Sequence, residues 1–450
     1  MNLSQFKERL FEEGEKQGFS ELELYYEKNN SLIIALYEGD VDEYNSEEVQ
    51  GASVRGRYKG KTGYAYTEKL DEDSIQFLLK NAKENAELIE NEPEEFFTEQ
   101  ATYEEAEFYS PDIEKVSPEE MIELLKDVEK KIFAQDSRVT KIDALGVRKV
   151  MMEKGIFHNE GLTLNERNNF LMIMVSVLVQ ENDELKSGMD FKVTKDFKTL
   201  DADDVAKEVV ENALSYLGEQ SYPNKNYPVV LKNTAAASLL STFASSFSAQ
   251  AVQDNQSRLK DKLSETIAAT QVTLIDDPFL KDGVLSSTFD SEGVPTSKHT
   301  IVDAGKLQTY FHNLKTVKKD GVASTGHARR ESYKDAIEVG PSNFYVEPAK
   351  MSYEEQYVDL EEGIIITGLA GLHSGANQIS GDFSLAADGY YVENGEIVGP
   401  TKQMTVAGNF FDLLKDVEKV GNDLEFTPMS FHGYVGSPSL KIKSLAIAVD

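Results

Sequence analysis

Residues 21–27 read Glu21-Leu22-Glu23-Leu24-Tyr25-Tyr26-Glu27, and this stretch predicts the first strand of the fold. Three apolar side chains fall on one side of an extended chain and three carboxylates on the other: Leu22, Leu24 and Tyr26 against Glu21, Glu23 and Glu27. Alternation with period two is typical of a strand that buries one face. We therefore expect a half-buried strand here.

The segments around this strand complete a first structural unit. A helix is expected over residues 3–17, and further strands over 31–37, 49–58 and 61–67. The apolar residues that follow are spaced as on one face of a second helix: Ile75, Leu78, Leu79, Ala82, Ala86 and Ile89. Residues 1–90 are therefore expected to form an amino-terminal α+β unit.

A second α+β unit is expected over residues 117–222. It is preceded by residues 91–116, a strongly acidic stretch without periodicity that indicates a solvated linker. Ser117-Pro118-Glu119-Glu120 has the signals of a helix start, with a capping Ser, Pro in the first helical position and a carboxylate three residues after the Ser. Strands at about 139–152, 168–180 and 187–195 and a helix at about 201–217 follow.

Residues 223–450 have a different character. One helix rich in Ala, Ser, Leu and Phe is expected over residues 233–250, and short strands and many turns follow it. Asn394-Gly395, between two short apolar runs, predicts a β-hairpin with a two-residue turn. The fold class is therefore α+β, with a mixed α/β amino-terminal region followed by a β-rich carboxy-terminal domain.

Composition and charge exclude several classes of protein. The chain has 450 residues and no Cys, so disulfides, thiolate nucleophiles and Cys-based metal sites are excluded. Lys and Arg number 46 against 79 Asp and Glu, a net charge of −33, which opposes contact with nucleic acid. The most apolar run, residues 170–179, is too short for a membrane helix of about 20 residues. We expect a cytoplasmic protein with no membrane partner.

Common catalytic motifs are absent from the sequence. None of the six His residues belongs to an HExxH motif, and no G-x-S-x-G elbow or Walker lysine is present. Three other constellations of polar residues remain as candidates. Arg329 and Arg330 beside Glu331 could hold a substrate carboxylate, although a structural ion-pair network is an equal alternative. Asp382, in Gly381-Asp382-Phe383-Ser384, could line a cleft or belong to a tight turn. The third constellation is the pair of carboxylates Asp290 and Glu292, within residues 289–293, for which we expect a structural role.

Several stretches, in this order and spacing, resemble the TldD/PmbA family, once called modulators of DNA gyrase and regarded as zinc metallopeptidases. They are residues 289–296, 324–327, 380–384, 392–396, 407–409 and 420–423. The resemblance covers nearly the whole chain and is densest over residues 230–445. It implies an amino-terminal α+β region and a β-rich carboxy-terminal domain.

The resemblance also indicates a branch of the family. The TldD branch carries an HExxxH motif on a helix rich in small residues, and a Cys-Gly near the carboxy terminus completes its zinc site. In this chain Ser241 and Ser246 stand at the two His positions, and Thr242 stands at the Glu position. His432-Gly433 lies near the position of the Cys-Gly. Neutral hydroxyls are weak zinc ligands, so the chain is similar to the PmbA branch, also called TldE.

The resemblance therefore implies a non-catalytic subunit of a cytosolic peptide-degrading metallopeptidase. No catalytic or metal-binding residue is expected, with Ser241, Thr242 and Ser246 as vacated positions and His432 as a weak metal candidate. No cofactor is expected in this chain, and zinc is expected in a TldD-type partner; a homodimer is the other expected assembly. Two alternatives stay open. The chain could be active by itself through a non-standard metal site that uses His432, or it could be a non-enzymatic regulator of DNA gyrase.

Overall fold

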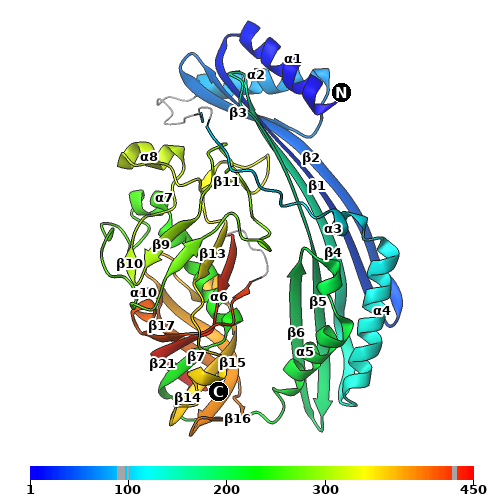
Figure 1. Cartoon of the computed structure of the whole chain (residues 1–450), viewed down its shortest axis with the longest axis vertical. Coiled ribbons are helices and arrows are strands. Elements are labelled where there is room, and N and C mark those ends of the chain that lie inside the picture. The colour runs from blue at the N-terminus through cyan, green and yellow to red at the C-terminus, as the bar shows by residue number, and fades with distance from the viewer. Residues whose placement is uncertain (89–96, 99–100, 428–432, 450) are drawn as a thin grey trace.

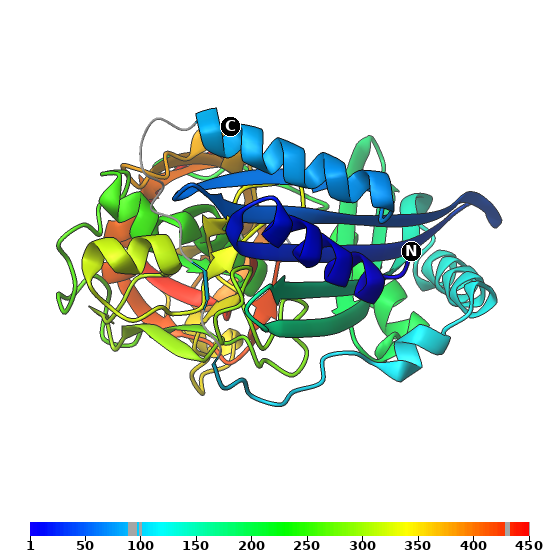
Figure 2. The same cartoon turned by 90° about the horizontal axis from the view of Figure 1, so that it is seen from above.

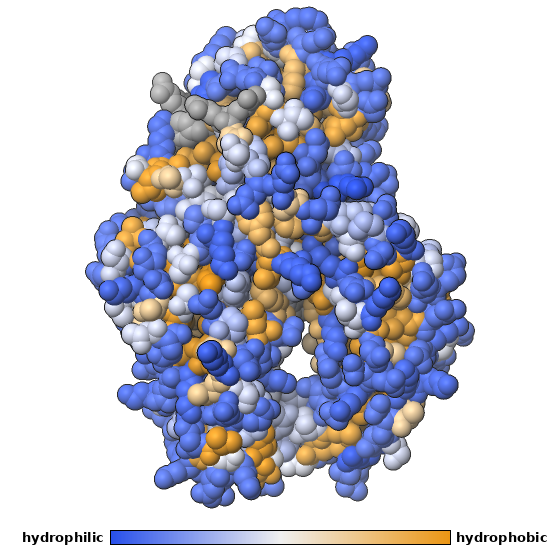
Figure 3. Space-filling model, in the orientation of Figure 1, coloured by the Kyte–Doolittle hydropathy of each residue, from blue (hydrophilic) through white to orange (hydrophobic). Residues whose placement is uncertain are grey.

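The computed structural model describes residues 1–88, 97–98, 101–427 and 433–449. Two regions lie side by side (Figure 1): a long curved sheet with helices, built from the amino-terminal half, and a β-rich carboxy-terminal region. They meet in the upper half of the view, and an opening lies between them in its lower half, with contact again beneath it (Figure 3). The predicted α+β class is confirmed.

The amino-terminal sheet has six antiparallel strands in the order β3-β2-β1-β4-β5-β6. The pairing of β1 with β4, from Glu23↔His158 to Ala35↔Gly146, joins the strands of both predicted amino-terminal units into this one sheet. The strands are β1 (Phe19–Tyr37), β2 (Asp40–Tyr58), β3 (Lys61–Thr67), β4 (Val139–His158), β5 (Thr163–Glu181) and β6 (Glu184–Thr194).

Two pairs of helices cover this sheet, and Figure 2 shows the first pair from above. Near the amino terminus, α1 (Leu3–Lys16) and α2 (Glu72–Leu88) bury Phe6, Leu10 and Leu78 against the sheet. At the other end, α4 (Pro118–Gln135) and α5 (Ala202–Leu214) pack on β4 and β5 through a second core. The predicted start of α4 is confirmed, since Ser117 and Glu120 form a reciprocal capping box with Pro118 in the first turn.

The predicted acidic linker lies partly outside the described residues, which omit 89–96 and 99–100. Its last part is not solvated as expected. Phe108 and Tyr109 are buried, and the short helix α3 (Pro111–Lys115) buries Ile113. The acidic composition of the segment gave no sign that these apolar residues pack against the sheet.

The 3-10 turn η1 (Phe197–Thr199) leads from β6 into α5.

The carboxy-terminal region contains a closed five-stranded barrel. Strands β14, β7, β21, β17 and β15 pair in that order, and β14 also pairs with β15, which closes the ring. The edge strand β16 and the short β18 extend it. The five barrel strands are β7 (Lys225–Leu231), β14 (Glu362–Ala370), β15 (Asp382–Glu393), β17 (Met404–Asn409) and β21 (Leu440–Val449). The two added strands are β16 (Glu396–Pro400) and β18 (Val417–Val420).

A second sheet and several short elements surround the barrel. The sheet has the order β10-β9-β8-β13-β20-β19, and β11 pairs separately with β12. These strands are β8 (Leu274–Asp276), β9 (His299–Asp303), β10 (Lys306–Leu307), β11 (Ala328–Arg329), β12 (Glu338–Val339), β13 (Asn343–Val346), β19 (Glu425–Phe426) and β20 (Tyr434–Ser437). The short helices are α8 (Leu314–Asp320), η3 (Glu354–Gln356), α9 (Leu372–Gly375) and α10 (Phe410–Lys415).

The predicted Asn394-Gly395 hairpin is confirmed. Glu393 pairs with Glu396, and both turn residues have positive φ, 52° at Asn394 and 77° at Gly395. Asn and Gly adopt this left-handed conformation most readily, which is why the dipeptide predicts the turn. Within the part of the chain that the structure describes, no helix is long and apolar enough to cross a membrane.

Candidate functional site

The helix expected over residues 233–250 is interrupted in the structure. It consists of α6 (Asn233–Phe243), the 3-10 turn η2 (Ala244–Phe247) and α7 (Ala249–Gln253). Ser248 has an extended backbone and caps α7, so its local hydrogen bond competes with a continuous helix. Two aromatic anchors flank the break. Phe243 stacks on Phe410 with ring centres 4.5 Å apart, and Phe247 packs on Phe344 in the core.

The three vacated positions lie at this break. Ser241 is in α6 and buried, Thr242 is half-buried, and Ser246 is in η2 with 1% exposure. The Thr242 hydroxyl donates to the Ser238 carbonyl (2.9 Å), and the Ser246 hydroxyl donates to the Gln378 carbonyl (3.1 Å). The break therefore separates the two positions that would carry His ligands in an HExxxH motif.

The donor set at these positions does not fit a zinc ion. It offers three neutral hydroxyls, two of which are committed to backbone carbonyls, where zinc requires imidazole, thiolate or carboxylate. In the described residues, no group of three His, Asp or Glu side chains is placed to hold a metal ion. His432, the weak metal candidate, lies outside the described residues.

The loop that precedes β15 packs against the break, and Asp382 is the first residue of β15. Ser245 Oγ donates to Gln378 Oε1 (3.2 Å), close to the bond from Ser246. The Asp382 side chain is exposed and accepts hydrogen bonds from Asn409 Nδ2 and Ser380 Oγ, both at 2.8 Å. These two hydrogen bonds lower the pKa of Asp382, and the bond from Asn409 has the larger effect. The structure therefore places Asp382 as an exposed anion at the start of β15, four residues after Gln378, which accepts hydrogen bonds from Ser245 and Ser246.

The Arg329-Arg330 stretch lies elsewhere, at the contact between the two regions, against residues 289–293. Ser291 N–H donates to Ala328 O (2.9 Å), and Ala328 N–H donates to Asp290 Oδ2 (3.0 Å). Arg330 Nη2 then donates to Ser291 O (3.1 Å). Two motifs that are separate in sequence thus form one structural unit.

Arg330 connects this unit to the amino-terminal sheet. Its side chain is fully buried and donates to Ser53 Oγ (3.1 Å), Tyr64 OH (3.0 Å) and Glu23 Oε1 (3.5 Å). Its guanidinium carbon lies 4.1 Å from the centre of the Tyr25 ring, a cation–π contact. Of the two alternatives for Arg330, the structure therefore shows the ion-pair network.

Glu23 is the centre of that network. It is 1% exposed, with Arg55 Nη2 at 2.7 Å and His158 Nε2 at 3.1 Å. Burial alone would raise its pKa, but the charges of Arg55 and Arg330 and the His158 hydrogen bond lower it to about 2. Our placement of Glu23 on the exposed side of a half-buried strand is wrong, because the carboxy-terminal region covers that side.

Two more buried carboxyls face this network. Burial raises the pKa of both Asp290 and Glu292, although Asp290 accepts three backbone N–H bonds and Arg55 Nη1 lies 3.7 Å from Glu292 Oε1. Sequence reasoning missed Glu23, Arg55 and His158 as partners. The one available signal was Arg55 itself, a charge that directly follows the small and apolar residues 51–54.

Arg329 and Glu331 are not part of the network. Arg329 is half-buried, burial lowers its pKa, and its guanidinium has no hydrogen bond or ion pair with another described residue. Glu331 is exposed. Of the predicted cleft residues, Arg329 therefore keeps its donors available for a ligand.

A third polar group lies in the carboxy-terminal region. The buried His327 uses both ring nitrogens, with Nδ1 2.8 Å from Thr325 Oγ1 and Nε2 3.1 Å from Asp276 Oδ2. Ser342 N–H also donates to Asp276 (2.7 Å). His299 lies nearby, its ring centre 5.6 Å from that of His327. Because both ring nitrogens of His327 bond to residues of this chain, its role is structural.

Models of three consecutive domains of one family match this chain. The PmbA/TldA metallopeptidase domain 1 matches residues 22–86, the central domain matches residues 111–217, and the C-terminal domain matches residues 224–449. The chain belongs to the PmbA/TldD family.

Known proteins agree with this assignment to the PmbA/TldD family. Metalloprotease PmbA of Escherichia coli O157:H7 is 26% identical over 93% of this chain and 91% of its own length. The crystal structure of a Thermotoga maritima protein, a proposed modulator of a DNA gyrase, superimposes with a TM-score of 0.91 at 31% identity, over 99% of this chain and all of that one. TldE from Thermococcus kodakarensis has the same fold, with a TM-score of 0.90 at 22% identity, over 98% of this chain and all of that one.

Proposed function

We propose that this chain is the PmbA/TldE-type subunit, without its own zinc, of a cytosolic metallopeptidase system that degrades or processes peptides. Its partner is a homologous TldD-type subunit that bears the HExxxH motif and supplies the zinc. This chain contributes walls of the space in which the peptide is held. Family membership is the basis for the proposal of peptidase chemistry.

The observation that carries the subunit assignment is the chemistry of the α6–η2 break. Ser241, Thr242 and Ser246 offer only hydroxyls, and those of Thr242 and Ser246 bond to backbone carbonyls of this chain. Without a Glu at position 242, no base stands beside a metal-bound water. A second subunit with the full motif would supply what this site lacks.

Two of the predicted cleft residues support a role in peptide binding. Arg329 has a guanidinium without a partner in the described residues, and a guanidinium can bind a carboxylate with two parallel hydrogen bonds. Asp382 presents an anion beside the vacated helix, where a peptide amine or a basic side chain could bind. We propose these two residues as peptide contacts.

Reconstitution tests the proposal. The purified chain is mixed with a TldD-type subunit from the same genome, and complex formation, zinc content and peptide hydrolysis are measured for each subunit and for the mixture. We expect a stable complex whose activity exceeds that of either subunit alone. Absence of association at micromolar concentration would refute the pairing.

One observation favours a second function, a peptidase that is active by itself. The Escherichia coli relative, 26% identical, is named a metalloprotease PmbA. If this chain shares such an activity, its metal site must use residues other than Ser241, Thr242 and Ser246, with His432 as one ligand. Zinc bound stoichiometrically to the isolated chain, and lost together with activity in His432→Ala, would establish this function.

Regulation of DNA gyrase is a third function to test, because that is the proposed role of the Thermotoga maritima relative. The net charge of −33 opposes DNA contact but permits binding to a basic protein surface. An electrophoretic shift of DNA at low salt, or a change in gyrase supercoiling rate with this chain, would support it.

A further inference from the structure

The outer edge of β2 is unpaired along half of the strand. The sheet order ends with β3-β2-β1, and β3 pairs only with residues 52–58 of β2. Before residue 52, β2 therefore has β1 on one side and no strand from the described residues on the other. All ten residues from Asp40 to Val49 are exposed. At about 3.3 Å per residue, this free edge is about 33 Å long.

The pairing pattern shows which backbone groups face outward. Lys59 and Gly60 have positive φ and form a two-residue turn, so Tyr58 and Lys61 are a hydrogen-bonded pair. Bonded pairs recur at every second residue, so the even-numbered residues of β2 bond to β3. Continued past residue 52, the same alternation directs the N–H and C=O groups of residues 44, 46, 48 and 50 to the free edge. A neighbouring strand could bond to all four.

The free edge is strongly acidic. Six carboxylates lie from Glu38, in the turn before β2, to Glu48 inclusive, and the next Lys or Arg along the chain is Arg55. Glu48 pairs with Lys28 at 3.0 Å, whereas the other five have no ion pair in the described part of the chain. Apolar side chains are exposed among them, with Tyr44 at 56% and Val41 at 41%. The edge therefore combines free backbone donors and acceptors, apolar contacts and negative charge.

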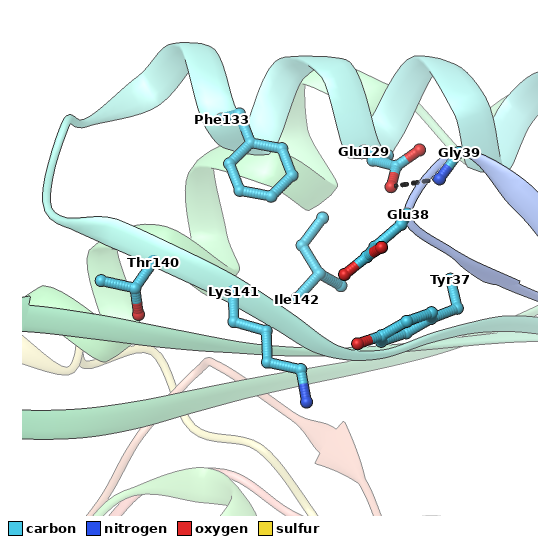
Figure 4. Close-up of a pocket in the computed structure, with 8 residues that line it drawn as sticks. All are labelled: Tyr37, Glu38, Gly39, Glu129, Phe133, Thr140, Lys141 and Ile142. Atoms are coloured by element: carbon cyan, nitrogen blue, oxygen red, sulfur yellow. Dashed lines mark hydrogen bonds between the residues drawn. The ribbon is translucent and has the colours of Figure 1, made fainter.

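A groove lies where this edge begins, at the tip of the β1–β2 hairpin (Figure 4). Its volume is about 390 Å³, and its walls include Tyr37, Phe133 of α4 and Ile142 of β4. Gly39 N–H donates to Glu129 Oε1 (2.9 Å), which fixes the turn against α4. Phe133 and Tyr37 are exposed at 50% and 45%. An apolar side chain of a molecule that lies along the edge could bind in this groove.

A second copy of this chain is a poor occupant. Antiparallel pairing of two identical edges would bring one acidic run against the other, and like charges directly opposite each other destabilise a strand pair. A basic strand would instead meet opposite charge along the whole edge. The free length is also nearly twice that of a mean strand, about 5–6 residues, which suits the edge of a folded subunit better than a short peptide.

We propose that the free edge of β2, residues 40–50, docks an edge strand of the heterologous subunit, and that this incoming strand carries Lys or Arg side chains. The inference rests on the proposed pairing with a TldD-type subunit and assigns a surface to it. Backbone hydrogen bonds extend the six-stranded sheet across the interface, and the acidic side chains select a basic partner.

The test uses variants of the full chain mixed with the TldD-type subunit. Ser46→Pro removes an outward N–H and leaves the bonds to β1 in place, since edge positions tolerate Pro when the N–H faces solvent. The double variant Glu43→Lys/Glu47→Lys reverses two unpaired charges. Its matched control, Glu393→Lys/Glu396→Lys, reverses two exposed carboxylates on the hairpin of β15 and β16. Circular dichroism verifies folding, and Kd is measured at low and high salt.

We expect Ser46→Pro and the β2 charge reversal each to weaken the complex by about tenfold or more, and the control to leave Kd within about twofold. The effect of charge reversal should shrink at high salt. A complex that all folded variants form with the parental Kd would overturn this inference while the subunit pairing stands. No complex with the parental chain would overturn both. A homodimer of the parental chain that Ser46→Pro dissociates would replace the basic partner with a second copy.

Discussion

Arg330 Nη2 lies 3.5 Å from Glu23 Oε1, although the two residues are 307 positions apart in the sequence. Both side chains are essentially excluded from solvent, at 0% and 1% exposure. This pair joins the carboxy-terminal region to the amino-terminal sheet. A buried ion pair of this kind is costly to break from one side, because the remaining charge stays in a low dielectric.

Arg330→Ala should therefore destabilise the chain strongly. We expect a loss of about 3 kcal/mol in the free energy of unfolding, since Glu23, Ser53 and Tyr64 lose a common partner. Arg329→Ala is the matched control and should cost less than about 1 kcal/mol, because its guanidinium makes no bond to another described residue. Urea unfolding followed by circular dichroism measures both. Equal losses for the two variants would contradict the division of roles.

The same Arg329 variant tests the proposed peptide contact in the reconstituted enzyme. With a peptide that ends in a free carboxylate, Arg329→Ala should raise KM by about tenfold or more with kcat little changed, as expected for loss of a charged hydrogen bond. With the amidated peptide, parental and variant complexes should have the same KM. A loss that is identical for the two peptides would show that Arg329 does not bind the carboxylate.

Stability should fall on the acid side of neutrality because of His312. His312 is 3% exposed, and burial lowers its pKa from 6.5 to about 4. The unfolded chain then binds more protons between pH 6.5 and 4, so the free energy of unfolding decreases as the pH falls through this window. The full effect is about 3 kcal/mol. His312→Gln should flatten this dependence, whereas His373→Gln, at an exposed position, should retain it.

An unchanged pH profile in His312→Gln would contradict this account. Below pH 4.5 the free energy of unfolding depends on pH for a different reason, and this dependence should remain in His312→Gln. Glu23 has its pKa lowered to about 2, so the stability it contributes is present above pH 4.5 and is lost as the pH falls towards 2. Thermal unfolding at pH intervals from 3 to 8 separates the two windows.

The sequence predicted those features that depend on nearby residues. The capping box of Ser117 and Glu120 and the turn at Asn394-Gly395 each involve residues within a few positions of one another, and both are confirmed. Long-range pairing could not be predicted in the same way. Nothing in the alternation of residues 21–27 shows that β1 pairs with β4 or that a distant loop covers the acidic face. The pattern distinguishes two faces of a strand but not which of them meets solvent.

The same distinction between local and long-range features holds for the candidate site. Family motifs located Ser241, Thr242 and Ser246 on one segment. In the structure, however, α6 ends at Phe243, which stacks on Phe410, and the extended backbone of Ser248 separates η2 from α7. The two arginines were adjacent in sequence and equal in type. Only the tertiary structure distinguishes the buried Arg330 from the available Arg329.

Restoration of the motif tests the alignment of this helix with the family's metal helix. We expect Ser241→His/Thr242→Glu/Ser246→His to gain zinc affinity but little peptidase activity. The supporting hydrogen bonds that orient metal ligands are missing, which typically costs about 10–100-fold in affinity or activity. The side chain at position 246 must also leave the Gln378 carbonyl. Zinc content and peptide turnover are compared with those of the parental chain. Parental zinc content in a folded variant would mean that another helix corresponds to the metal helix.

We propose above that this chain works without its own zinc, beside a subunit that has it. The most direct measurement is the zinc stoichiometry, by mass spectrometry of the metal, of the isolated chain, the isolated TldD-type subunit and their complex, each paired with its peptide turnover. We predict negligible zinc and negligible turnover for the isolated chain, and a complex whose zinc equals that of the TldD-type subunit and whose turnover exceeds the sum of the parts. One equivalent of zinc in the isolated chain, with turnover that disappears when the metal is removed and returns when it is restored, would contradict the account.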